Sequence, residues 1–198
     1  MSLNGWLTHL RRILSALALM PIFLAMLSGC GGPGANLPPI PPTVPGAYHL
    51  GPGDQVRIIT LGEDRMTGEF RVNDSGEVAL PLLGTIRAAG LTTGELQQAL
   101  GTALVQAQLI REPSVSVEVT GYRPIFVLGE VNHPGQFPYQ PGMTVVTAAA
   151  VAGGFTYRAV EDRASIVRTI DGKAVEGLAA RQTYVQPGDV ITIYERRF

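Results

Sequence analysis

The side chains that most often carry out chemistry in enzymes are few in this 198-residue chain. His49 and His133 are the only histidines after residue 29, and His133 lies in an Asn-His-Pro-Gly stretch typical of a turn. The sequence has no HExxH, GxSxG or phosphate-binding-loop motif. We therefore expect no catalytic, cofactor-binding or metal-binding site, and we expect that the chain is not an enzyme.

The carboxylates that could form an acid–base pair lie in glycine-containing turns: Asp54, Asp74, Asp171 and Asp189. Aspartate in such a turn normally accepts hydrogen bonds from nearby backbone N–H groups, so a structural role is expected for each. Two of them complete a repeated Pro-Gly-Asp turn that precedes a strand-forming sequence. Proline presets φ and the next glycine accepts φ > 0, so we predict type II turns at Gly53 and Gly188.

The repeated turn has two interpretations. Pro-Gly-Asp is a good turn sequence in any protein, or two related β-domains lie in tandem. One copy begins its domain and the other lies near the end of its domain, so the repeat alone is weak support for duplication.

The N-terminal region has the layout of a secretion signal. Two arginines, Arg11 and Arg12, precede an apolar run over residues 13–27, which is shorter than the ~20 residues of a membrane span. The run ends in Leu27-Ser28-Gly29-Cys30, which resembles the bacterial lipobox. That resemblance implies a lipoprotein signal peptide over 1–29, cleavage before Cys30, and a diacylglycerol on its thiol. No acidic residue follows, which implies an outer-membrane anchor facing the periplasm.

Residues 30–46 contain the lipidation site and a proline- and glycine-rich spacer. Six prolines in 33–46 and the lack of periodicity exclude a helix or a central strand. In the polyproline II conformation the segment would be a semi-rigid spacer of up to ~40 Å, and plain disorder is the alternative.

Residues 47–121 are predicted to form one globular domain. Alternating or β-rich runs predict strands at 55–61, 69–72, 77–81 and 114–119, with a short extended piece at 85–90. A Thr92–Glu95 capping box and leucines at helical spacing predict a helix over 93–109.

Residues 122–198 are predicted to form a second domain with a similar plan. Strands are expected at 124–131, 136–139, 164–170 and 173–178, and after the last Pro-Gly-Asp turn. Thr144 is expected to cap a short alanine-rich helix. Glycines are expected to end that helix or to form turns: Gly135, Gly153 and Gly154. The fold class that follows is α+β, with two tandem small β-grasp-like domains, each a mixed sheet packed on one helix.

Charge is distributed without a basic surface. After residue 29 the chain has a net charge near −3, and its arginines are scattered singly. We therefore expect no nucleic-acid partner.

Several motifs at fixed distances resemble one bacterial family. YHLGPGDQVRI, VNDSGEVALPLLGTIRAAGLTTGEL and REPSVSVEV are similar to the polysaccharide-export domain of outer-membrane polysaccharide export lipoproteins. VLGEVNHPGQFPYQPGMTV, AAAVAGGFT and QPGDVITIYER resemble the soluble-ligand-binding β-grasp domain that follows it. The resemblance covers residues 47–198. The larger exporters of the family carry further domains and a C-terminal pore helix, so the chain resembles the short branch of xanthan- and acetan-type systems.

The resemblance implies a function without chemical catalysis. It implies export of exopolysaccharide through a homo-oligomeric ring, with an inner-membrane polysaccharide co-polymerase as partner. Each domain has only about 75 residues and no disulfide, so contacts within an assembly would supply missing apolar burial.

A monomeric periplasmic lipoprotein that binds polysaccharide or peptidoglycan is the alternative. Sugar sites need exposed aromatic side chains, and most aromatics here fall in predicted strands. Tyr139 and Tyr157 lie close to turns and are the candidate sugar contacts.

Overall fold

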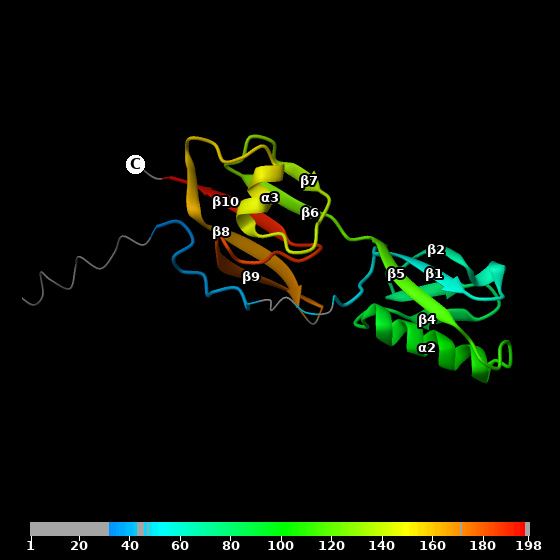
Figure 1. Cartoon of the computed structure of the whole chain (residues 1–198). Helices are drawn as coiled ribbons and strands as arrows, with labels where there is room; N and C mark the ends of the chain where they lie inside the picture. The colour runs from blue at the N-terminus through cyan, green and yellow to red at the C-terminus, as the bar shows by residue number, and fades with distance from the viewer. Residues whose placement is uncertain (1–31, 43–45, 47, 171, 197–198) are drawn as a thin grey trace, which may run out of the picture.

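The computed structural model describes residues 32–42, 46, 48–170 and 172–196. It has the α+β class and forms two tandem small β-grasp-like domains, which Figure 1 shows as two lobes joined by a short linker between β5 and β6. The predicted signal peptide and Cys30 lie outside the described residues.

The first domain combines a three-stranded sheet, a β-hairpin and one long helix. Its elements are β1 (Gln55–Thr60), the 3-10 turn η2 (Asp64–Met66), β2 (Gly68–Arg71), β3 (Glu77–Leu80), β4 (Gly84–Arg87), α2 (Thr93–Gln106) and β5 (Val115–Gly121). β1 is central and antiparallel to both β2 and β5, while β3 and β4 form the separate hairpin. Burial alternates along β1, so one face of this sheet joins the core.

Helix α2 begins as predicted and ends earlier. The Thr92 hydroxyl accepts the Glu95 N–H at 3.2 Å, and the Glu95 carboxylate accepts the Thr92 N–H at 2.8 Å, which confirms the capping box. The hydrogen bonds that the N–H and the hydroxyl of Thr92 donate to the Glu95 carboxylate lower the pKa of Glu95. The helix ends at Gln106 instead of Leu109, because Gln108 adopts a left-handed φ of 56° that no α-helix continues through.

The second domain is a five-stranded mixed sheet packed on one short helix. Its elements are β6 (Ile125–Gly129), β7 (Gly135–Phe137), α3 (Val145–Val151), β8 (Ala159–Ile170), β9 (Lys173–Ala180) and β10 (Val190–Glu195). The order is β7-β6-β10-β8-β9, with β10 parallel to β6 and antiparallel to β8. β8 begins five residues before its predicted start, because Ala159 pairs with Glu195 beyond an irregularity in β10.

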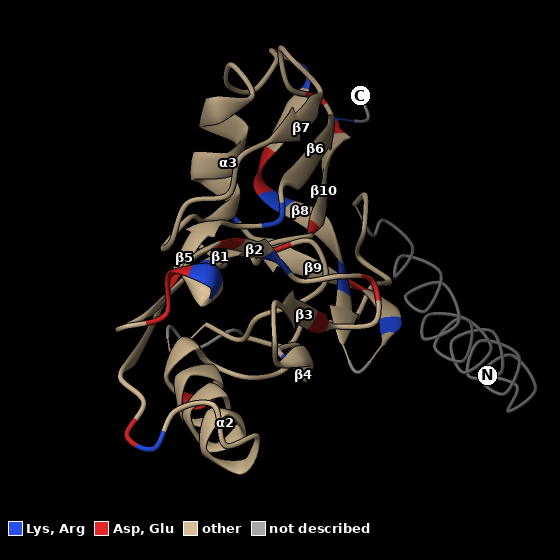
Figure 2. Ribbon diagram, turned by 90° about the vertical axis from the view of Figure 1, so that its right-hand side faces the viewer, with Lys and Arg blue, Asp and Glu red and all other residues tan. Residues whose placement is uncertain are grey.

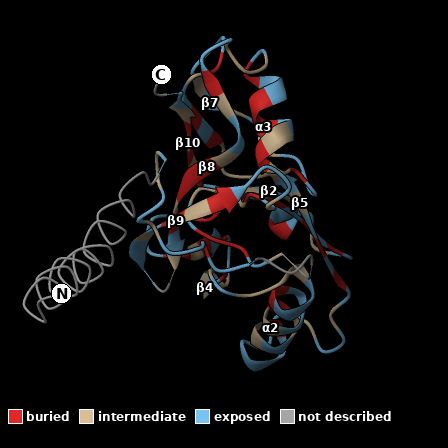
Figure 3. Ribbon diagram, turned by 90° about the vertical axis from the view of Figure 1, so that its left-hand side faces the viewer, coloured by how far each residue is buried: buried red, intermediate tan, exposed pale blue. Residues whose placement is uncertain are grey.

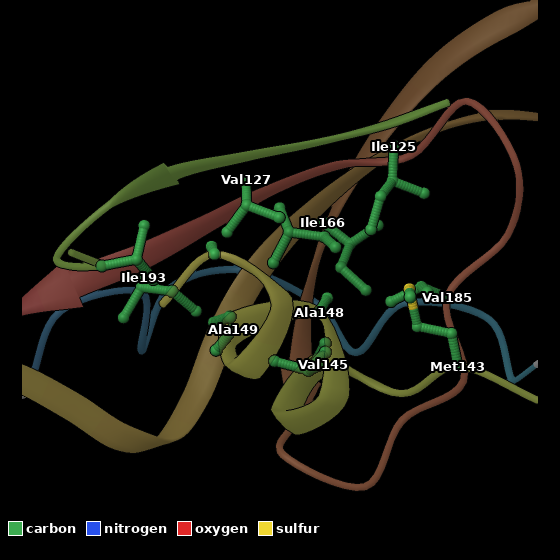
Figure 4. Packing of buried hydrophobic residues seen from close by; sticks show 14 of the residues in the cluster. Ile125, Val127, Met143, Val145, Ala148, Ala149, Ile166, Val185 and Ile193 are labelled. Carbon is green, nitrogen blue, oxygen red and sulfur yellow. The ribbon is translucent and has the colours of Figure 1, made fainter. Parts of the chain in front are cut away.

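Small residues let α3 lie close to the sheet. Ala148 and Ala149 are fully buried, and Figure 4 shows them facing the side chains of Val127 and Ile166. Figure 3 shows the buried positions of α3 on one side of the helix and exposed positions on the other. The predicted Thr144 cap is present. Gly153 and Gly154 end the helix with φ of 84° and 86°, as predicted.

The proline-rich segment differs from the expectation of a free spacer. Residues 38–40 run along the edge of β9: Ile40 N–H donates to Leu178 O at 2.9 Å, and Leu178 N–H donates to Pro38 O at 2.8 Å. Ile40 is 5% exposed and belongs to the core of the second domain. Prolines are tolerated there because a sheet edge needs only part of the N–H pattern.

A glycine on β9 makes this docking geometrically feasible. A Cβ on Gly177 would lie 2.7 Å from the Cα of Ile40, so only glycine fits at this close approach. Burial of the Ile40 side chain contributes about 1.5–3 kcal/mol relative to exposure. The prediction of a spacer over the whole of 30–46 is therefore wrong for the stretch around Ile40, which belongs to the second domain.

Both Pro-Gly-Asp turns are type II turns, as predicted. Gly53 and Gly188 have φ of 98° and 90°. The Asp54 N–H donates to Gly51 O, and the Asp189 N–H donates to Gln186 O, each at 3.1 Å. Gly135, predicted as a turn residue, is instead the first residue of β7 and has no left-handed φ.

Replacing either turn glycine should lower the free energy of unfolding, and backbone strain should account for almost all of the loss. A Cβ on Gly188 would meet no atom within 4 Å, and one on Gly53 would meet only side-chain atoms of Arg123 and Arg71, at 3.4 Å or more. Val at each position should lower the free energy of unfolding by about 1–2 kcal/mol in urea melts. Gly94→Val is the control, since Gly94 has open space and no left-handed φ. Equal stability of all three variants would contradict the turn assignment.

Candidate functional site

The two repeated turns lie on either side of the linker that joins the domains. Arg123 N–H donates to the Asp54 carboxylate at 3.0 Å, from the first turn. Gly188 N–H, in the second turn, donates to Pro124 O at 3.0 Å. The turn of the first domain thus binds Arg123, and the turn of the second domain binds the next linker residue, Pro124.

Each turn is organised by a buried aspartate. Asp54 and Asp189 are 0% and 1% exposed, and each accepts the backbone N–H three residues earlier, from Gly51 at 2.8 Å and Gln186 at 2.7 Å. This confirms the predicted local role of both carboxylates. Because buried carboxylates also need a counter-charge, each has an arginine partner that the sequence analysis missed.

The two arginine partners differ in geometry. Arg168, 4% exposed, donates to both Asp189 oxygens, from Nε at 2.9 Å and Nη2 at 2.6 Å. Arg123 is 30% exposed, and its Nε lies 3.4 Å from Asp54 Oδ1 without forming a hydrogen bond. The pair in the second domain is therefore the tighter one.

A row of three tyrosines crosses the boundary between the domains. The rings of Tyr48 and Tyr122 lie 5.0 Å apart at 76°, and those of Tyr122 and Tyr139 lie 5.4 Å apart at 69°. Both are edge-to-face contacts, the arrangement that aromatic quadrupoles favour. The Tyr48 hydroxyl donates to Asp54 at 2.5 Å and accepts from Arg123 at 3.0 Å. Burial and the hydrogen bond to Asp54 raise the pKa of Tyr48, and burial raises that of Tyr139.

These residues border a cavity of about 1050 Å³, which we name the interdomain cavity. Four tyrosines line it: Tyr48, Tyr122, Tyr139 and Tyr184. Pro41 and Pro42 of the docked segment supply part of its wall, and Arg168 donates to Pro41 O at 3.4 Å. The surface that the cavity offers consists of ring faces, hydroxyls and guanidinium groups, while the nearby carboxylates are engaged in hydrogen bonds within the fold.

The other residues that the sequence analysis considered have various positions. Tyr157 is 87% exposed and is not among the residues that line it. His49 lines the cavity, whereas His133 lies beside Gly153 in the second domain. Asp171 and Cys30 lie outside the described residues.

Two structural findings concern metals and membranes. Within the described part of the chain, no group of three or more His, Cys, Asp or Glu residues could hold a metal ion. The described helices include none that is long and apolar enough to cross a bilayer. Figure 2 shows acidic and basic positions dispersed over both domains.

One sequence signal could have revealed the buried arginine. Along β8, Ala164 and Ile166 are buried in the core, and Arg168 lies two residues further on at the next position of the same parity. A cation at a core-facing strand position requires a buried partner. Arg123 carries no comparable signal, because it lies in the linker between β5 and β6 rather than at a core-facing strand position, and it is 69 residues from Asp54 in sequence.

Comparison with known proteins decides the family. Residues 42–120 match the family described as polysaccharide biosynthesis/export protein, and residues 124–179 match the SLBB domain. This chain belongs to the polysaccharide export protein family. The boundary between the two matches falls at the linker that the repeated turns hold.

Three relatives of this family member have informative names. The exopolysaccharide production protein ExoF of Rhizobium meliloti (strain 1021) is 34% identical over 66% of this chain and 32% of its own length. The EPS I polysaccharide export outer membrane protein EpsA of Ralstonia nicotianae is 26% identical over 73% of this chain and 40% of its own length. The polysialic acid transport protein KpsD of Escherichia coli is 27% identical over 54% of this chain and 19% of its own length. The chain spans less than half the length of each.

Proposed function

We propose that this polysaccharide export protein forms a lipid-anchored ring at the outer membrane that guides exopolysaccharide out of the periplasm without catalysing a reaction. The observation that carries the proposal is that both domains match the export family's two domains in order. The relatives' names place them in polysaccharide production, export and transport, and one in the outer membrane.

The junction between the domains supports a structural role in transport. Its two buried aspartates each hold a turn and an arginine, so their oxygens act as structural acceptors. The linker is hydrogen-bonded from both domains, which favours a subunit whose domains keep a fixed relation. Such a subunit suits a ring, because every copy must present the same surfaces to its neighbours.

The docked proline-rich segment limits how far the second domain can lie from the membrane. Pro38 is paired with β9, and only seven residues lie between it and Cys30. The eight Cα-to-Cα steps that join Cys30 to Pro38 therefore span at most about 30 Å. An anchor at Cys30 would therefore keep the second domain near the leaflet. The first domain would extend towards an inner-membrane polysaccharide co-polymerase, the proposed partner.

The native mass of the full-length protein tests the ring. After extraction from outer membranes in mild detergent, native mass spectrometry should find a discrete complex of several copies. A mass of a single chain at all protein concentrations would contradict the ring and would favour the alternative, a monomeric lipoprotein that binds polysaccharide or peptidoglycan.

Replacement of Cys30 tests the anchor. Cys30→Ser removes the thiol that would receive the lipid, so the precursor should remain uncut and should not incorporate labelled fatty acid. The wild-type chain, expressed at the same level, is the control. A Cys30→Ser protein that is still lipid-labelled and cut normally would show that the anchor lies elsewhere.

A further inference from the structure

The interdomain cavity is built from three separate parts of the chain. The first domain contributes Tyr48, and the second contributes Tyr139 and Tyr184. The docked segment contributes Pro41 and Pro42. The preceding residue, Ile40, holds them in place, because its side chain is buried and its backbone is hydrogen-bonded to Leu178 of β9. A cavity whose walls come from both domains and from the proline-rich segment exists only in the assembled fold.

The charges that face the cavity are already matched. Its lining includes two cations, Arg123 and Arg168, and each is paired with an aspartate that is at most 1% exposed. The described residues that line it include no carboxylate. A ligand that entered would therefore meet little net charge, and an anionic ligand would have to compete with aspartates that the fold holds in place.

The remaining lining is aromatic, apolar and hydroxylated. Tyr184 is 40% exposed, and Tyr139 is partly buried against the core of the second domain. Thr169 and Gln186 add polar side chains to the same lining. The volume of about 1050 Å³ is just above the ~300–1,000 Å³ range of ligand sites, so it leaves room for a ligand larger than a single sugar ring.

We propose that the interdomain cavity binds a short segment of uncharged polysaccharide, a proposal that rests on the proposed export function. Pyranose rings have an apolar C–H face that packs on tyrosine rings, and their hydroxyls exchange hydrogen bonds with tyrosine, threonine and amide groups. Such a site holds a passing chain by a few weak contacts at a time.

Binding of saccharides to the full-length lipoprotein in detergent micelles tests the proposal. The probes are short oligosaccharides from partial acid hydrolysis of the source bacterium's exopolysaccharide, separated by anion exchange into neutral and acidic pools. Saturation-transfer NMR should detect binding of the neutral pool in preference to the acidic pool.

The matched variants are chosen to keep the fold. Tyr184→Ala removes an exposed ring, and Tyr139→Leu keeps apolar volume but removes the flat face. Each should weaken binding of the neutral pool by at least about threefold, with unfolding midpoints close to wild type for Tyr184→Ala. Tyr157→Ala removes a more exposed tyrosine outside the cavity lining and should leave binding unchanged.

Several results would overturn the proposal: no binding of the neutral pool, preference for the acidic pool, or equal binding by the two cavity variants and wild type. If the native mass of Tyr184→Ala falls to that of a single chain, Tyr184 contacts a neighbouring copy instead, and this result would also overturn the proposal. Measuring secretion by a strain that lacks the protein distinguishes a failure of the cavity proposal from a failure of the proposed export function. If a strain lacking the protein stops secreting polymer but no pool binds, the export function stands and only the cavity assignment fails.

Discussion

Arg168→Met should lower the free energy of unfolding by about 3–5 kcal/mol, the cost of leaving a buried carboxylate without its counter-charge. Asp189, at 1% exposure, would lose two charge-assisted hydrogen bonds and keep the N–H of Gln186. Met fills much of the arginine's volume, so the loss in the free energy of unfolding reports the missing counter-charge more than a cavity. Urea melts of the purified protein give the value.

Two variants make this result specific. Arg57→Met breaks an ion pair with Glu69 whose side chains are 50% and 57% exposed, so it should cost at most about 1 kcal/mol. Arg168→Met combined with Asp189→Leu removes both buried charges and should be more stable than Arg168→Met alone. A loss for Arg168→Met no larger than that for Arg57→Met would show that the Asp189 pair does not organise the second turn.

Local sequence patterns predicted most of the fold. Three of these patterns involve only residues that are close in sequence: the alternation in β1, the capping box at Thr92 and the double glycine after α3. Their structures could therefore be predicted from the local sequence. The turn role of Asp54 and Asp189 was predictable for the same reason, since each bonds a backbone N–H three residues away.

Contacts between distant segments were not predictable in the same way. The docking of Ile40 on β9 depends on an open sheet edge and on the missing Cβ of Gly177, which is 137 residues away in sequence. A proline-rich segment has no periodicity that would reveal its partner. The interdomain cavity depends on how two domains and this segment meet. Tyr139 could therefore be proposed as a sugar contact, while Tyr48, at the other end of the tyrosine row, was missed.

Loss of the protein should abolish secretion of exopolysaccharide, the largest functional effect that the account predicts. If the chain guides finished polymer outward, then synthesis at the inner membrane does not depend on it. Lipid-linked repeat units should still form in a deletion strain, and the wild-type gene supplied in trans should restore secretion. The repeat unit that the complemented strain secretes should be chemically identical to that of the parent strain.

The most direct test of export without catalysis is therefore the paired measurement of polymer in the medium and of lipid-linked repeat units in the membrane of the deletion strain. The account predicts that secreted polymer falls to background while unaltered lipid-linked repeat units persist. Secretion at the parental level would contradict the export function. Repeat units that lack a linkage or a substituent would contradict the absence of catalysis.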